Sequence, residues 1–440
     1  MKKIGLFCVA ASFFLIQPVK AELFNMSSYT LNNGMQLVVV PNHKAPIVQQ
    51  MIWYKVGAAD EKTGKGGAAH LLEHLMFRGT SKIKGQDFNR ILEDNGAKSN
   101  AFTSQDFTVY HQFVDISRLE LAMFLEADRM QNLQIDADSF ETERKIVYQE
   151  RKQVVENDPM YLFNEEMQRA FWQQHPYARP ITGTEDEILN LTVEDVKDIY
   201  SRYYNPQNAV LVIAGDIEPD LAYKLAEKYY GNIENKGKRN QRNILPDKVK
   251  TNTVINMKLP QIDVPRLVRK YKAPYYVNGG KAIYPLMILS KYLGEGEISF
   301  LYNRLVIEEK IAASVSVSYN FAVSGGSFTI YAIPAKDIAI ADLQKSVDEA
   351  VVLALKNLNK AELSKIKKQM LAGLIFVRDN PSQAAQIAGM LAAQGMKKDE
   401  IEAYAENIQN VTLDEVKKAA ANVFSSTSVE GIALSKGDKK

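Results

Sequence analysis

The residues His70–Thr80, with the sequence HLLEHLMFRGT, place His70 and His74 four positions apart, with Glu73 directly before the second histidine. Apolar periodicity predicts a helix from about residue 68 to residue 77. Positions i and i+4 of a helix lie on one face, so both imidazoles can reach one metal ion. The order is the reverse of the zinc-binding pattern His-Glu-x-x-His, in which the acid follows the first histidine. The stretch therefore predicts a metal-binding helix.

Histidine is rare in this chain, which has five in 440 residues. The alternative to a metal site is a pair of helix-surface histidines beside a salt-bridging glutamate, and chance predicts about 0.003 such motifs in a chain of this composition. His43, His111 and His175 have no ligand-like spacing and are expected to have surface or structural roles. The one cysteine, Cys8, lies near the N-terminus, so no thiolate site is expected beyond it.

A catalytic zinc site needs a third protein ligand and an open position. The predicted acidic helix over residues 137–156 offers carboxylates for this role: Glu141, Glu143, Glu150 and Glu156. Glu143 and Glu150 are seven residues apart and so project from the same face of the helix. Spacing alone does not choose between them.

The N-terminus has the pattern of a secretory signal peptide. Lys2 and Lys3 precede an apolar run over residues 4–16 and a small-residue site that ends at Ala21. Cleavage after Ala21 and export, most simply to the periplasm, are expected. No later segment reaches transmembrane length. The formal net charge of +2, without a basic stripe, argues against nucleic-acid binding.

A repeat indicates two homologous halves. Leu191–Lys197 resembles Val411–Lys417 after a shift of 220 residues, and each copy opens a helix with a threonine cap and early acids. Each is followed by an aromatic residue (Tyr204, Phe424) and then by a strand expected to end in Gly-Asp (Gly215-Asp216, Gly437-Asp438). The expected organisation is a signal peptide (1–21), a zinc-binding half (22–235), a linker (236–250) and a second half without metal (251–440).

Four segments carry a resemblance to a known family: His70–Thr80, Asn95–Tyr110 (NGAKSNAFTSQDFTVY), Leu119–Met130 (LELAMFLEADRM) and Phe140–Glu150 (FETERKIVYQE). The chain resembles the pitrilysin/insulinase family of inverted-motif zinc peptidases, short-chain branch, which includes the mitochondrial processing peptidase β subunit. The resemblance covers nearly all of the chain after the signal. It implies an α+β fold with two homologous α/β halves, each a mixed or antiparallel sheet flanked by helices, and pairing as a clamshell dimer.

The resemblance also assigns roles at the site. The family's third ligand lies about 76 residues beyond the second histidine, which is Glu150 here. The ligands of one Zn²⁺ per chain would then be His70, His74 and Glu150, and Glu73 would take the proton of the zinc-bound water and pass it to the leaving amine. Glu143 stands where the family carries a supporting glutamate. Its alternative is a surface acid paired with Arg144 or a lysine.

Asn100 and Ala101 match the family segment along which substrate peptide adds as an extra strand. In the second half, Ile283, Leu286 and Met287 stand where the metal motif would be, so one metal per chain is expected.

The second half also departs from the family pattern. Val306 and Ala313 stand where an arginine and a tyrosine usually help to hold the substrate and the oxyanion. Arg304 and Tyr319 are nearby substitutes at the wrong spacing. A paralogous subunit that supplies the Arg/Tyr pair, or a homodimer of modest activity, is therefore expected.

The expected function is that of an exported zinc metalloendopeptidase acting on peptides or unfolded polypeptides. The alternative is a catalytically weak or non-catalytic scaffold or binding subunit of a paired peptidase complex. Presequence processing is disfavoured by the export signal.

Overall fold

The computed structural model describes residues 22–435 except 86, 237–251 and 277–279. The predicted signal peptide and nearly all of the predicted linker lie outside the described residues, so the cleavage site and the domain boundaries stay predictions. Among the helices of the described residues, none combines the length and the apolar character needed to cross a membrane.

The first half contains a six-stranded sheet in the order β1-β2-β6-β3-β5-β4. Its central strands β6 and β3 are almost entirely buried, as the apolar run of β6 predicts, although β3 also buries Gln49 and Gln50. The edge strand β4 is only partly buried. The bounds are β1 (Ser27–Thr30), β2 (Gln36–Pro41), β3 (Ile47–Tyr54), β4 (Lys98–Thr103), β5 (Thr108–Asp115) and β6 (Ala209–Gly215).

The second half contains a five-stranded sheet in the order β7-β11-β8-β10-β9. It repeats the order β2-β6-β3-β5-β4 of the first sheet, and β1 has no counterpart among its described strands. β7 runs parallel to β11 as β2 does to β6, and the remaining pairs are antiparallel in both sheets. The predicted α+β fold with two homologous halves is therefore confirmed. The bounds are β7 (Thr253–Lys258), β8 (Arg266–Ala273), β9 (Ala312–Phe321), β10 (Gly326–Pro334) and β11 (Ser428–Leu434).

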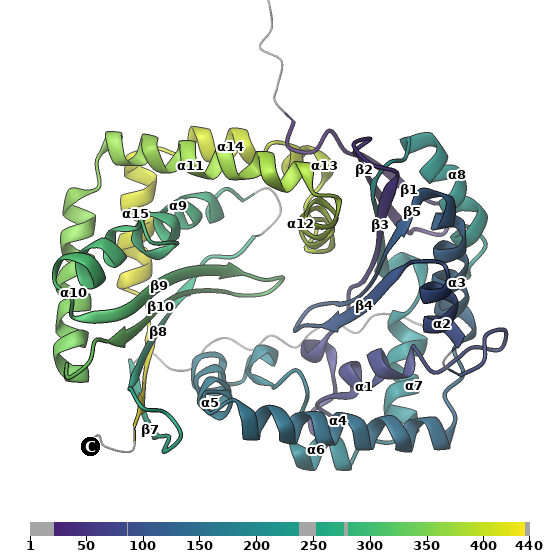
Figure 1. Cartoon of the computed structure of the whole chain (residues 1–440), viewed down its shortest axis with the longest axis horizontal. Helices are drawn as coiled ribbons and strands as arrows, with labels where there is room; N and C mark the ends of the chain where they lie inside the picture. The colour runs from purple at the N-terminus through teal and green to yellow at the C-terminus, as the bar shows by residue number, and fades with distance from the viewer. Residues whose placement is uncertain (1–21, 86, 237–251, 277–279, 436–440) are drawn as a thin grey trace, which may run out of the picture.

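Helices surround both sheets (Figure 1). Those of the first half are α1 (Ala68–Leu75), α2 (Asp87–Asp94), α3 (Leu119–Asn132), α4 (Ala137–Asn157), α5 (Tyr161–Trp172), α6 (Glu185–Leu189), α7 (Val193–Tyr203) and α8 (Pro219–Tyr230). Those of the second half are α9 (Ile283–Gly294), α10 (Ile340–Asn357), α11 (Lys360–Asp379), α12 (Pro381–Ala393), α13 (Lys398–Glu402), α14 (Tyr404–Asn410) and α15 (Leu413–Phe424). Short 3₁₀ turns and one π-helical stretch, η5 (Tyr302–Glu308), complete the described elements.

The repeated helix-capping sequence behaves as predicted. Thr192 is the N-cap of α7 and Thr412 is the N-cap of α15, and each forms a capping box with the acid three residues later. The strand after the first copy ends at Gly215, as expected. For the second copy, β11 ends at Leu434, and the predicted end at Gly437-Asp438 lies outside the described residues.

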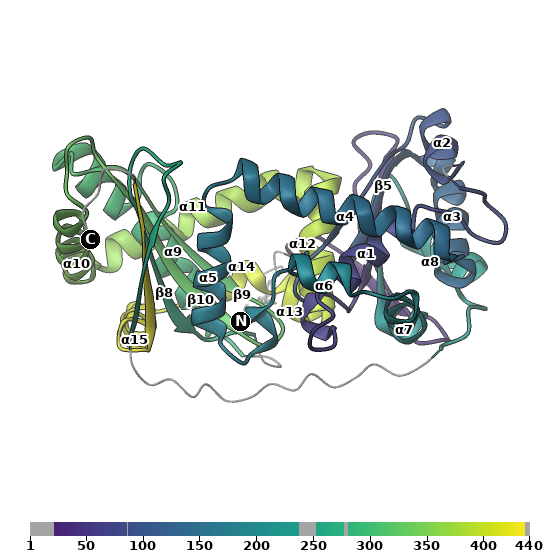
Figure 2. The same cartoon turned by 90° about the horizontal axis from the view of Figure 1, so that it is seen from below.

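The two halves exchange helices. Helix α5 of the first half packs on β11 and β7, and α12 of the second half packs on β6 and β3 (Figures 1 and 2). Two glycines permit the close approach: a Cβ at Gly431 would overlap Met167 of α5, and a Cβ at Gly389 of α12 would overlap Trp53 of β3. Each half therefore covers part of the other's sheet.

Candidate metal centre

Helix α1 is anchored by its apolar face, which is fully buried in the core of the first half. That face contains Leu71, Leu72 and Leu75. Its N-terminus begins at Gly67, whose φ of +87° and closeness to Thr182 O exclude a side chain. Glu61 accepts hydrogen bonds from the backbone N–H groups of Gly67 and Ala69, at 3.1 and 2.8 Å. The helix that carries both histidines is thus held by its own core and cap.

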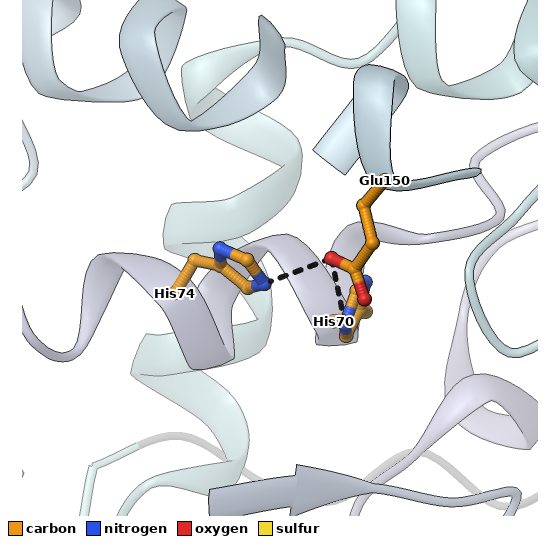
Figure 3. A group of neighbouring side chains, drawn as sticks. All are labelled: His70, His74 and Glu150. Atoms are coloured by element: carbon orange, nitrogen blue, oxygen red, sulfur yellow. Dashed lines mark ion pairs between the residues drawn. The ribbon is translucent and has the colours of Figure 1, made fainter. Parts of the chain in front are cut away.

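The structure brings His70, His74 and Glu150 together between α1 and α4 (Figure 3). Glu150 Oε2 lies 3.9 Å from His70 Nε2 and 3.5 Å from His74 Nε2. All three ligand atoms lie within 4.8 Å of one another. In a tetrahedral zinc site with bonds of about 2.0–2.1 Å, ligand atoms are about 3.3 Å apart. The set is slightly wider than that, and its two nitrogens and one oxygen fit a zinc ion with a fourth position open.

Glu143 lies behind His74 and is almost completely buried. Its Oε2 is 3.0 Å from His74 Nδ1, and its Oε1 accepts a hydrogen bond from Arg78. The alternative of a surface pair with Arg144 is wrong, because Arg144 pairs with Glu141 instead. A carboxylate on the second ring nitrogen fixes the tautomer and orientation of a ligating histidine. The role of Arg78 was not predicted, although its place four residues after His74 in the sequence was a usable signal.

The pKa values of the two grouped histidines differ sharply. Burial, with His74 adding to it, lowers the pKa of His70 to about 4, so its ring is neutral at pH 7. Burial also lowers the pKa of His74, but its hydrogen bonds to Glu143 and Glu150 outweigh that effect and raise the pKa to about 9. Without a metal, His74 is therefore protonated at pH 7. Its positive charge lies between the carboxylates of Glu143 and Glu150, which could also bind a cation.

Glu73 lies outside the ligand group, on the side of an open pocket of about 740 Å³. Thr103 Oγ1 donates a hydrogen bond to Glu73 Oε2 at 2.6 Å. Burial raises the pKa of Glu73, and the Thr103 hydrogen bond opposes this effect. His74, Asn100 and Ala101 line the same pocket. A carboxylate beside the ligands but not among them is suited to proton transfer.

Asn100 and Ala101 lie on β4, the edge strand of the first sheet. Asn100 is exposed, and its side-chain oxygen accepts a hydrogen bond from the N–H of Ala101 at 2.8 Å. The outer side of β4 has no neighbouring strand in the described sheet. This edge can accept an added peptide strand beside the pocket.

The second half offers no equivalent metal set among the described residues. Ile283 and Leu286 are buried apolar residues of α9, and Met287 packs against the same core. Val306 lies in η5 and Ala313 on β9. The substitute Arg304 is tied in ion pairs to Glu308 and Glu309 and is therefore not a free cation.

The other histidines contribute to structure rather than to the site. His43 Nδ1 lies 2.7 Å from Asp216. His175 is buried, with its Nε2 3.2 Å from Ser324 O and its Nδ1 accepting from the Tyr177 N–H. His111 lies on β5, outside the ligand group.

Both halves of the chain match models of one known protein family. Residues 37–185 match the profile described as Insulinase (Peptidase family M16), and residues 190–370 match the Peptidase M16 inactive domain. The chain is 31% identical over 382 residues to the zinc protease PqqE of Helicobacter pylori, covering 83% of this chain and 82% of that protein.

Solved structures share the fold. The crystal structure of a protease from Helicobacter pylori superposes with a TM-score of 0.87 at 27% identity, over 93% of this chain and 99% of that one. The periplasmic protease PqqL of Escherichia coli gives a TM-score of 0.79 at 15% identity, over 93% of this chain and 47% of PqqL. At 15% identity, the similarity to PqqL shows only that the two proteins share a fold.

Proposed function

Because the chain belongs to the insulinase (M16) family of peptidases, we propose that it is a zinc-dependent endopeptidase that hydrolyses peptides or unfolded polypeptides. The observation that carries the proposal is the meeting of His70, His74 and Glu150 beside the separate carboxylate of Glu73. Structural metal sites are closed by four protein ligands, whereas catalytic ones keep a position open for water or substrate. Three ligands next to an open pocket fit the second kind.

In this proposal His70, His74 and Glu150 hold one zinc ion per chain. When bound, the ion supplies a Lewis acid that polarises the scissile carbonyl and lowers the pKa of water. Glu73 accepts the proton of the attacking water and returns it to the leaving amine. Glu143 orients His74 through the contact at Nδ1 and does not touch substrate.

Substrate would bind along β4, with its backbone paired to the strand edge and its reactive carbonyl over the pocket that Glu73 lines. Asn100 is placed to hydrogen-bond that backbone once its present bond to Ala101 opens. Main-chain recognition suits extended, unfolded chains rather than folded proteins. This supports a peptide or unfolded-polypeptide substrate.

We further propose that a second subunit completes the site. The chain corresponds to 47% of PqqL, so one chain is equivalent to about half of that longer protease. Val306 and Ala313 replace the expected Arg/Tyr pair, which a paralogous partner or a second copy would have to supply. Export to the periplasm is proposed from the N-terminal signal pattern. The related PqqL is described as periplasmic.

The alternative is a scaffold or binding subunit with the fold but little activity. The match of the second half to an inactive M16 domain is compatible with it. The complete set of His70, Glu73, His74 and Glu150 favours the peptidase.

The test compares the wild-type chain with Glu73→Gln and Glu150→Ala, in zinc content and in cleavage of a quenched-fluorescent unstructured peptide, alone and with candidate partner subunits. We expect one zinc per wild-type chain, retained zinc without turnover in Glu73→Gln, and lost zinc in Glu150→Ala. Cleavage that survives Glu73→Gln, or a wild-type chain that binds no zinc, would overturn the proposal.

A further inference from the structure

Glu73, which lines the pocket, accepts a short hydrogen bond from Thr103. Thr103 is the last residue of β4, and its hydroxyl donates to Glu73 Oε2 at 2.6 Å. Both side chains are partly buried. Among the described residues, Glu73 Oε1 has no hydrogen-bond partner. One carboxylate oxygen is therefore held, and the other stays available for a proton from the pocket.

The hydroxyl of Thr103 has one weaker alternative acceptor nearby, the hydroxyl of Thr108. Its cross-strand partner in the hairpin is Thr108, whose Oγ1 lies 3.5 Å away and itself donates to the backbone oxygen of Val56 at 3.0 Å. The contact with Thr108 is at the limit of a hydrogen bond, whereas the contact with Glu73 is short and charge-assisted. The geometry thus commits the Thr103 proton to Glu73.

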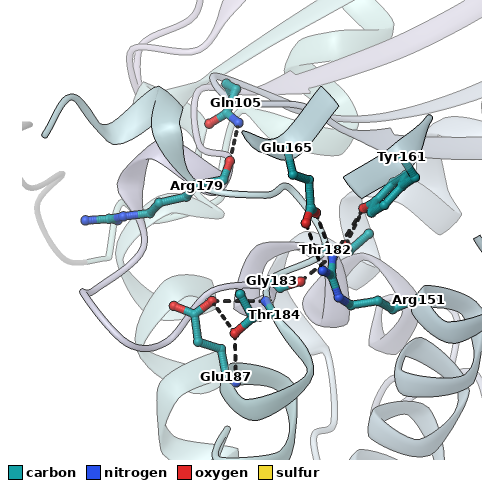
Figure 4. A network of polar contacts seen from close by, with 9 residues as sticks. All are labelled: Gln105, Arg151, Tyr161, Glu165, Arg179, Thr182, Gly183, Thr184 and Glu187. Atoms are coloured by element: carbon teal, nitrogen blue, oxygen red, sulfur yellow. Dashed lines mark hydrogen bonds and ion pairs between the residues drawn. The ribbon is translucent and has the colours of Figure 1, made fainter. Parts of the chain in front are cut away.

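The turn that follows Thr103 is fastened by the first half. The backbone oxygens of Ser104 and Gln105 accept hydrogen bonds from the N–H groups of Ala58 and Ala59, at 3.0 and 2.9 Å. The side chain of Gln105 donates to Arg179 O at 2.8 Å (Figure 4). The loop beyond Arg179 is tied to α4 and α5 through Thr182, Arg151 and Glu165, drawn in the same figure. The end of β4 therefore cannot shift without moving these contacts.

Asp106, in the same turn, is bound by residues of both halves. Asp106 is buried and accepts hydrogen bonds from the Tyr177 hydroxyl at 2.8 Å and from the N–H of Val323 at 3.0 Å. Val323 lies in the turn between β9 and β10, so the hairpin turns of the two halves meet at Asp106. This contact links the half without metal to the strand end that carries Thr103.

We propose that Thr103 is a positioning residue for Glu73: its hydroxyl fixes one carboxylate oxygen so that the other faces the water to be deprotonated. The inference rests on the proposed peptidase function. A glutamate has three side-chain torsions, and without this bond its carboxylate can turn toward solvent or another partner. Misplacement of a reacting group by about 1 Å can cost about 100-fold in rate.

The experiment compares Thr103→Val, which is isosteric but cannot donate, with Thr103→Ser, which keeps the hydroxyl. Thr108→Val is the matched control, because it removes the neighbouring buried hydroxyl without touching Glu73. Each variant is measured for kcat and KM on the same peptide, for zinc content, for thermal unfolding, and for the orientation of Glu73 in a zinc-loaded crystal structure.

We expect Thr103→Val to lower kcat about 10- to 100-fold with KM and zinc content unchanged, and its Glu73 carboxylate to leave the wild-type orientation. Thr103→Ser should retain kcat within about threefold, and Thr108→Val should lose stability but keep kcat within the same range. A loss equal in Thr103→Val and Thr108→Val, a Ser variant as slow as the Val variant, or an unmoved Glu73 in Thr103→Val would overturn the inference.

Failure of the proposed function is recognised separately. If the wild-type chain shows no hydrolysis that Glu73→Gln abolishes, with or without a partner subunit, the peptidase proposal has failed. The crystal structures then still decide whether Thr103 fixes Glu73. An unchanged Glu73 orientation in Thr103→Val would reject the positioning role on its own.

Discussion

Glu143 Oε2 lies 3.0 Å from His74 Nδ1, on the side of the ring opposite to Glu150. Arg78 holds the other oxygen of the same carboxylate. His74 therefore lies between two carboxylates, Glu143 at its Nδ1 and the proposed fellow ligand Glu150 at its Nε2. The orientation of His74 therefore depends on Glu143, which contacts its Nδ1 and not the proposed ligand atom Nε2.

Glu143→Gln is expected to weaken zinc binding about 10- to 100-fold without abolishing it, because the amide holds His74 less firmly and no longer pairs with Arg78. The measurement is a competition titration with a chromophoric chelator. Glu141→Gln is the control: Glu141 lies on the same helix, is half exposed and pairs with Arg144. It should keep wild-type affinity within about twofold, since surface ion pairs contribute little. Equal affinities in wild type and Glu143→Gln would contradict the orienting role.

Removal of zinc by a chelator is expected to abolish peptide cleavage but to leave the fold intact. Leu71, Leu72 and Leu75 are completely buried, and Glu61 caps α1, so the helix does not depend on the metal. The melting temperature should fall by only a few degrees, as mass action predicts for a bound ligand, and recover with added zinc. Circular dichroism melts with and without chelator measure this.

The control for chelation is Glu150→Ala, whose melting temperature should not respond to the chelator. Unfolding of the wild-type chain on chelation would show instead that the metal has a structural role.

Local patterns predicted most of the fold. The apolar periodicity of residues 68–77 and the capping sequence at Thr192 each depend on neighbours in the chain, and they reappear as α1 and α7 within a few residues. The grouping of His70 with His74 followed from helical spacing. The choice of Glu150 needed the family resemblance, because two acids on one helix face are equivalent in sequence.

The remaining features depend on long-range packing. The local sequence of α12 does not indicate that this helix covers the sheet of the other half. Any apolar helix face can pack on any apolar sheet face. The contact between Thr103 and Glu73 joins residues 30 positions apart. The anchor from Asp106 to Val323 joins residues 217 positions apart. Such pairs become visible only once both hairpins are placed.

The exchange of helices predicts opposite effects of alanine at two helical glycines. A methyl group at Gly389 would overlap the indole of Trp53, whereas one at Gly373 of α11 meets nothing within 4 Å. Gly389→Ala should lower the free energy of unfolding by about 1–3 kcal/mol through overpacking. Gly373→Ala should raise it by about 0.5–1 kcal/mol through helix propensity. Urea unfolding measures both, and a Gly389→Ala variant as stable as Gly373→Ala would mean that α12 does not seat against β3.

The ammonium group of Lys270 on β8 is covered by residues of α5. It lies 5.1 Å from the centre of the Phe171 ring and donates a hydrogen bond to Gln168. Burial, with the nearby charge of Lys272 adding to it, lowers the pKa of Lys270 to about 8. In the unfolded chain a lysine has a pKa of about 10.4, so between these two values the unfolded state binds more protons. Stability contributed at this site therefore rises with pH across that window.

Lys270→Met removes the titrating group and keeps the length of the side chain. At pH 7 the variant should be more stable than wild type by on the order of 1 kcal/mol, and the difference should shrink as the pH rises from about 8 to 10. Urea unfolding at pH 7 and pH 9.5 measures this difference, with Lys345→Met on the exposed face of α10 as the control. A gap that stays constant with pH would show that Lys270 remains charged at its place between β8 and α5. The free-energy cost of burying the charge would then be offset by the contacts of the ammonium group, and not avoided by loss of its proton.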